Sequence, residues 1–121
     1  MEYGLKKRME LFGVAVDEAI ERFMGNEALF KKYFCKFRQD KNYENLVNAL
    51  NQGYTQEAFI AAHSLKGVCG NLSMVRLEEE AGRMVEFLRQ GEIWKAKEAL
   101  CRVQKAYDEI IRAIDMLEKS R

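Results

Sequence analysis

Residues 93–117, IWKAKEALCRVQKAYDEIIRAIDML, place an apolar residue at every third or fourth position. The stripe consists of Ile93, Ala96, Leu100, Val103, Tyr107, Ile110, Ile114 and Leu117. An α-helix has 3.6 residues per turn, so these side chains share one face of a single long amphipathic helix. Because other helices must cover that face, the stretch predicts a helical bundle.

The composition favours the same fold class. The chain has 121 residues, 48% of them hydrophobic, which is enough for one core and for one domain over residues 1–121. It contains no proline and is rich in Leu, Ala, Glu, Lys, Arg and Met, the residue types that favour helices. We therefore predict an all-α protein, an antiparallel four-helix bundle with short additional N-terminal helices.

Apolar spacing marks further helices before the long one. The stripe Leu77, Ala81, Met84 and Leu88 predicts a helix over 74–90, which Gly91 follows where a helix C-terminus favours glycine. The helices 74–90 and 93–117 should form an antiparallel hairpin. The other expected helices are 27–39 with Asn26 as N-cap, a shorter one from Tyr43 to Gly53, 55–72, and two short pieces at 2–11 and 16–24 with a break near Gly13.

Charge and apolar run length exclude several classes of protein. The 20 basic and 19 acidic residues are interspersed, so no basic patch for nucleic acid is expected. The apolar runs are too short for a membrane span, and the N-terminus lacks the apolar core of a signal peptide. We expect a cytoplasmic protein without membrane insertion.

The three cysteines, Cys35, Cys69 and Cys101, form no C-x-x-C pair. Each has apolar neighbours at helical spacing, so we interpret them as reduced core residues. One histidine and three scattered thiols are a poor ligand set for zinc, and no metal site is expected.

Residues 61–73, AAHSLKGVCGNLS, contain the only histidine of the chain and two glycines inside an expected helix. Each glycine costs about 1 kcal/mol there relative to alanine. The apolar residues of this helix fall in one continuous arc, and His63 projects about 170° from its centre, toward solvent. The arc comprises Ala58, Ala61, Ala62, Leu65, Val68, Cys69 and Leu72, and the outer half holds Gln56, Phe59, Lys66, Gly67, Gly70 and Asn71 beside His63.

This arrangement suggests phosphoryl transfer. A lone histidine is more often a core or incidental surface residue, but Gly67 and Gly70 follow it by one and two turns and leave a bare strip for close approach. A neutral imidazole is itself a nucleophile, with an ordinary pKa near 6.5, and Lys66 supplies a mobile cation within one turn. We interpret His63 as a phosphoryl carrier.

The stretch AHSLKGVCGNLS resembles the H-x-x-K-G signature of histidine phosphotransfer (HPt) domains, which present a phosphorylated histidine on a four-helix bundle. The segments ERFMGNEALFKKYFCKF and LVNALNQGYTQEAFIAAHSLKG are similar to the helix order of bacterial members. The resemblance implies that His63 is the phosphoacceptor and Lys66 the cation that stabilises the phosphoryl group. It also implies a partner-binding surface formed by Phe59, Gly67, Gly70 and Asn71.

Further expectations follow from the resemblance. The partners are response-regulator receiver domains, which supply the aspartate and its Mg²⁺, and a hybrid sensor histidine kinase. The chain itself is a carrier without independent turnover and without a cofactor of its own. Family members often have glycine where this chain has Ser73, which we expect to cap the next helix. A polar side chain on that helix often reaches the phosphohistidine, and Arg83 and Glu86 are the candidates.

Two alternatives remain at this point. The protein could dock receiver domains without transferring phosphate, which labelling of the protein would reveal. It could instead hold a metal or haem, for which His63 and a second ligand would have to face inward between helices. We also expect a monomer, because the long helix carries one apolar stripe that the other helices can cover.

Overall fold

The computed structural model describes residues 1–120, which form seven α-helices and one short 3₁₀ helix, η1. They are α1 (Tyr3–Leu11), α2 (Val16–Arg22), α3 (Glu27–Lys36), η1 (Phe37–Gln39), α4 (Asn42–Gln52), α5 (Thr55–Asn71), α6 (Val75–Arg89) and α7 (Ile93–Lys119). No β-strand occurs in residues 1–120; the only extended pairing is an isolated antiparallel bridge between Val14 and Met74. The all-α prediction is confirmed.

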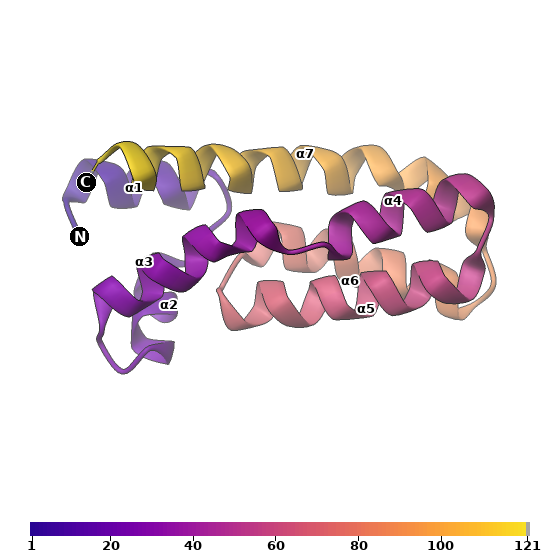
Figure 1. Cartoon of the computed structure of the whole chain (residues 1–121), viewed down its shortest axis with the longest axis horizontal. Helices are drawn as coiled ribbons and strands as arrows, with labels where there is room; N and C mark the ends of the chain where they lie inside the picture. Colours follow the sequence, from indigo (N-terminus) through magenta and orange to yellow (C-terminus); the bar gives the residue numbers. More distant parts are fainter. Residues whose placement is uncertain (121) are drawn as a thin grey trace.

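Helix α7 runs the length of the molecule, and the other helices pack along it (Figure 1). Helices α4, α5 and α6 lie beside its N-terminal part, with α5 packed between α4 and α6. Helices α1 and α3 contact α7 as well, near the end where both chain termini lie. The result is a four-helix bundle with short N-terminal helices that extend the core along α7.

The predicted apolar stripes form the core. All four stripe residues of α6, namely Leu77, Ala81, Met84 and Leu88, are buried. Along α7, Ala96, Val103, Ile110, Ile114 and Leu117 are buried, whereas Ile93, Leu100 and Tyr107 are half-buried against the same core. Tyr107 stacks on Tyr43 of α4, with ring centroids 4.0 Å apart, and so joins the two helices.

Glycine ends the helices where the sequence predicted breaks. Gly91, between α6 and α7, has a φ of 74°, in the left-handed region that glycine adopts without steric cost. Gly13, between α1 and α2, has a φ of 85°, and a Cβ there would lie 2.6 Å from Cβ of Arg76. Because glycine has no side chain at this point, residues 13–15 can lie directly against the start of α6.

The N-cap prediction for Asn26 is confirmed. The Leu29 amide donates a hydrogen bond to the Asn26 side chain.

All three cysteines are reduced, as predicted, but they differ in burial, and only Cys101 lies outside the core. Cys69 is fully buried, and burial raises the pKa of its thiol well above the ordinary value, which keeps it protonated and unreactive. Cys35 is half-buried. Cys101 is exposed, because it follows stripe residue Leu100 by one position and is therefore turned about 100° from the α7 stripe.

No helix in residues 1–120 combines the length and apolar character that a membrane crossing requires.

The sequence predicted that Ser73 is the N-cap of α6, and this prediction is wrong. Met74 occupies that position, and Ser73 is a buried residue with a φ of 53° in the turn between α5 and α6. Its carbonyl accepts from the Ala15 amide at 2.9 Å, and its hydroxyl donates to Glu18 at 3.2 Å. The left-handed backbone explains why glycine suits this position, and the hydroxyl contact joins the turn to α2.

We predict that Ser73→Gly changes the free energy of unfolding by less than about 1 kcal/mol. Glycine removes a left-handed strain of about 1–2 kcal/mol but also loses a hydrogen bond worth about 0.5–1.5 kcal/mol. Ser73→Val should destabilise by about 2–4 kcal/mol, because a β-branched residue is strongly disfavoured at positive φ. Urea unfolding of both variants measures the difference, and equal stabilities would contradict this account of the turn.

Candidate functional site

Helix α5 has two sharply different faces. Ala58, Ala61, Ala62, Leu65 and Cys69 are buried in the bundle, and Val68 and Leu72 lie at the edge of the same arc. His63 and Lys66 are exposed on the opposite side. The sequence prediction that the only histidine faces solvent is therefore confirmed.

The His63 ring lies in an aromatic and cationic environment. The Phe59 ring, one turn earlier on α5, is 6.0 Å from it between centroids, with 30° between the ring planes. The Arg89 guanidinium of α6 lies over the same Phe59 ring, with its Cζ 5.7 Å from the centroid. Within residues 1–120 the imidazole makes no hydrogen bond, so both ring nitrogens are available to a partner.

Lys66 leans from α5 onto α6. Its Cε and Cδ atoms lie 3.7 and 3.9 Å from the position that a Cβ of Gly82 would occupy. In the part of the chain that the structure describes, its ammonium makes no hydrogen bond or ion pair. The charge is therefore free to pair with an anionic group beside His63.

The contacts between α5 and α6 show a constant antiparallel register. Phe59 contacts Arg89, Lys66 contacts Gly82, and Gly70 contacts Glu78. Moving a given number of residues forward along α5 therefore corresponds to moving the same number backward along α6. His63 follows Phe59 by four residues, which places it level with the residue four before Arg89. That residue is Val85, whose side chain is 1% exposed. An aliphatic side chain of α6 thus lies level with the histidine.

The two polar candidates on α6 have different positions. Arg83 pairs with Glu79 and Glu80 of its own helix, and it lies about 100° around the helix from Gly82, away from α5. Glu86 lies one turn after Gly82 on the outer side of α6 and is 3.6 Å from Arg89. Within residues 1–120 neither side chain forms a hydrogen bond or ion pair with His63. The register leaves Glu86 as the nearer of the two.

The two glycines of the signature have different surroundings. A Cβ at Gly67 would have no atom within 4 Å, so this position is open surface one turn from His63. A Cβ at Gly70 would lie 2.9 Å from the Glu78 carboxylate of α6. Gly67 therefore belongs to the bare strip that the sequence predicted, whereas Gly70 serves the contact between the two helices.

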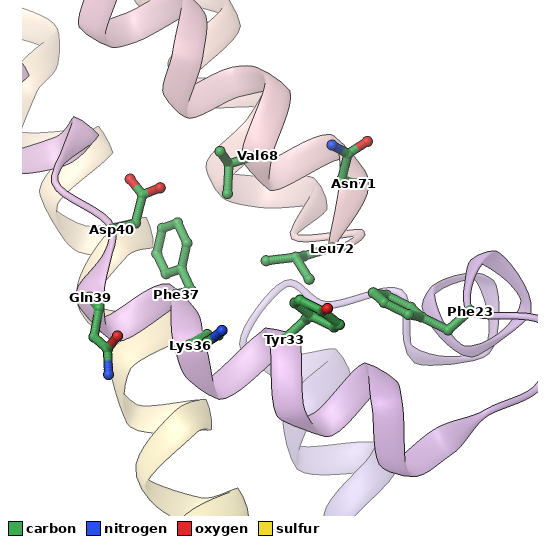
Figure 2. A pocket seen from close by; sticks show the side chains of 9 residues that line it. All are labelled: Phe23, Tyr33, Lys36, Phe37, Gln39, Asp40, Val68, Asn71 and Leu72. Carbon is green, nitrogen blue, oxygen red and sulfur yellow. The ribbon is translucent and has the colours of Figure 1, made fainter.

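Asn71 marks the far end of this surface. It is exposed at the end of α5 and borders a hollow of about 450 Å³ between α3 and α5. Figure 2 shows Tyr33, Phe37, Val68 and Leu72 around the hollow, with Asn71 at its rim. The hollow lies beside the buried arc of α5, and Asn71 joins its rim to the exposed end of the helix.

The site lacks the features of a metal centre. Among residues 1–120, no group of three or more His, Cys, Asp or Glu side chains is arranged to hold a metal ion. His63 faces solvent, which is incompatible with the inward-facing ligand that a metal- or haem-binding bundle needs. The exposed nucleophile and adjacent cation fit group transfer to a partner instead.

A family model of the Hpt domain matches residues 38–117. This segment runs from η1 through most of α7, which is more than half of the chain, and it contains the whole His63 surface of α5 and α6. The chain belongs to the Hpt domain family. Comparison with curated proteins and with solved structures found no significant match. Helices α1 to α3 precede the match, so the assignment of residues 1–121 to one Hpt domain stays a prediction.

Two residues that the sequence did not single out contact the candidate site residues. Gly82 lies under Lys66, and Arg89 lies over Phe59. Gly82 gave the same signal as Gly67 and Gly70, a glycine inside a periodic helix. Arg89 gave none, because a charged residue near a helix end is ordinary.

We predict that Gly67→Leu keeps or raises the stability of this Hpt domain but slows phosphoryl transfer at least ten-fold. Leucine removes about 1 kcal/mol of helix cost and meets no atom, yet it fills the surface beside the imidazole. Gln104→Leu, at an exposed position on α7, is the matched control for an added apolar side chain. A native transfer rate in folded Gly67→Leu would show that the bare strip has no role in docking.

Proposed function

We propose that His63 accepts a phosphoryl group from the aspartyl phosphate of a response-regulator receiver domain and returns it to such a domain. The observation that carries this proposal is an exposed imidazole on α5 with a lysine ammonium one turn away, neither of which has a hydrogen-bond partner among residues 1–120. Membership in the Hpt family, whose domains act in phosphorelays, supports it.

The reaction needs only a nucleophile and charge stabilisation. The lone pair of the distal ring nitrogen, Nε2, forms the N–P bond while the P–O bond to the aspartate breaks, and that electron pair returns to the carboxylate. The other ring nitrogen keeps its proton until solvent removes it. The Lys66 ammonium pairs with the phosphoryl oxygens and stabilises their negative charge.

The docking surface extends from Phe59 along α5 to Asn71. An interface of ordinary size covers about 800 Å² on each partner, a patch of roughly 16 Å radius. Asn71 follows His63 by eight residues, about 12 Å along the helix axis. A receiver centred on His63 therefore covers Gly67 and reaches Asn71 at the end of α5.

The protein acts as a carrier in this proposal. Hpt domains are phosphoryl carriers rather than catalysts. In the proposed reaction the Mg²⁺ is part of the receiver, beside its own aspartate. The proposed partners are receiver domains and a hybrid sensor histidine kinase. We propose further that the chain works as a monomer in the cytoplasm without a cofactor of its own.

His63→Gln should abolish labelling by a phosphorylated receiver while fold and receiver binding stay unchanged. The ring is exposed and contributes little to the core, so circular dichroism should match the wild type. Labelling with a panel of receivers phosphorylated by acetyl phosphate measures transfer, and titration calorimetry measures binding. If the wild type binds receivers but is never labelled, the chain is a docking module and the proposal fails.

Lys66→Ala should fold and bind the receiver but slow transfer by about ten-fold or more, which corresponds to 1.4 kcal/mol or more on the barrier. The variant keeps the nucleophile and loses only the cation beside the developing charge. Lys97→Ala removes an exposed lysine from α7 and is the charge-matched control. Equal transfer rates of the two variants would remove Lys66 from the mechanism.

A further inference from the structure

Helix α6 contains a glycine in its interior that no turn explains. Gly82 lies in the eighth position of a helix that runs from Val75 to Arg89 and has no positive φ. Glycine there costs about as much helix stability as Gly67 and Gly70 cost in α5. It is the residue of α6 that faces Lys66.

The contact with Lys66 uses the missing side chain. The Cδ and Cε atoms of Lys66 lie in ordinary van der Waals distance, 3.9 and 3.7 Å, of the position a Cβ would take. An alanine would therefore just touch the lysine stem, but any longer side chain would occupy the same space. Gly82 leaves a path across α6 that only the stem of Lys66 fills.

The general direction of helical side chains favours an ammonium near His63. Side chains of an α-helix lean toward its N-terminus, and His63 precedes Lys66 by three residues. A stem that rests on α6 stays in this direction instead of sampling solvent, and the ammonium keeps within a turn of the imidazole.

The carboxylates near Gly82 do not capture the ammonium. Glu78 and Glu86 lie one turn on either side of Gly82; Glu86 is 3.6 Å from Arg89, and the Glu78 carboxylate lies over Gly70. Lys66 pairs with neither of them. The contacts of the aliphatic stem with α6 therefore position the Lys66 side chain, and its charge remains available to a phosphoryl group.

We propose that Gly82 is a positioning residue for phosphoryl transfer: its bare backbone seats the stem of Lys66 across α6 and so holds the ammonium beside the phosphoryl group on His63. This inference rests on the proposed function of His63 and Lys66. It adds Gly82 of α6 as the residue that determines the position of the Lys66 ammonium.

The test combines Gly82→Gln and Gly82→Ala with Lys66→Ala. A receiver domain that labels the wild type, phosphorylated with acetyl phosphate, is the donor. Gly82→Gln should slow transfer by about the same factor as Lys66→Ala, at least ten-fold at saturating receiver, with the half-saturating concentration of receiver unchanged. Gly82→Ala, whose Cβ would only touch the lysine stem, should slow transfer less than Gly82→Gln does.

The double variant separates positioning from a general effect on the surface. In the Lys66→Ala background, Gly82→Gln should cause no further loss, because the residue acts only through the lysine. A further ten-fold loss there, or a raised half-saturating concentration, would mean that glutamine disturbs docking and would overturn the inference. A wild-type rate for the single variant Gly82→Gln would overturn it as well.

A measurement on the wild type decides the case if Gly82→Gln does not fold. Nuclear Overhauser contacts between the ε-methylene of Lys66 and the α-protons of Gly82 should be present. Their absence would contradict the packing of the Lys66 stem on Gly82. Failure of the proposed function looks different: no receiver that binds the wild type would then label it, whatever happens at Gly82.

Discussion

The close packing of α5 against α6 determines the rest of the site. Alanines on the buried face of α5 and glycines at two points of contact let the two helices meet in one constant register, with Gly70 next to Glu78 and Lys66 next to Gly82. That register presents the outer face of α5 to solvent and fixes which side chain of α6 lies beside each residue of the signature. A shift of either helix by one residue would move Gly82 away from Lys66.

Three glycines inside helices make this arrangement possible, and each has a different local reason. Gly67 faces open space, Gly70 admits the Glu78 carboxylate, and Gly82 admits the stem of Lys66. Each costs helix stability of about 1 kcal/mol relative to alanine. The continuous core along α6 and α7 offsets this cost, since it depends on neither the outer face of α5 nor the glycines. Stability and the site thus reside on opposite faces of the same helices.

Periodicity was sufficient to predict the helices and the direction of His63. The stripes of residues 74–90 and 93–117 lie in the core of α6 and α7, and the arc of residues 55–72 correctly placed the histidine outward. These are properties of single helices, which local spacing determines. The roles of Gly67 and Asn71 as partner contacts, in contrast, remain predictions.

The features that the sequence missed depend on contacts between distant segments. Ser73 has a left-handed backbone because the α5–α6 turn is joined to residues 14, 15 and 18, so its place in the signature did not reveal its conformation. The facing of Gly82 and Lys66, and of Val85 and His63, depends on the register between two helices, which no spacing within one helix determines. The core prediction for Cys101 failed for a local reason. Its sequence neighbours are apolar, but its own angle on α7 lies outside the apolar stripe.

The most direct test of the account identifies the atom that carries the phosphoryl group. The chain has one histidine, so its imidazole signals in a ¹⁵N-labelled sample are unambiguous. After incubation with a phosphorylated receiver domain, the account predicts that Nε2 of His63 changes its shift and acquires a coupling to ³¹P, while the backbone spectrum outside α5 and α6 stays that of the native bundle. A protein-bound ³¹P signal without coupling to an imidazole nitrogen, or His63 signals that remain unchanged with every receiver that binds, would contradict it.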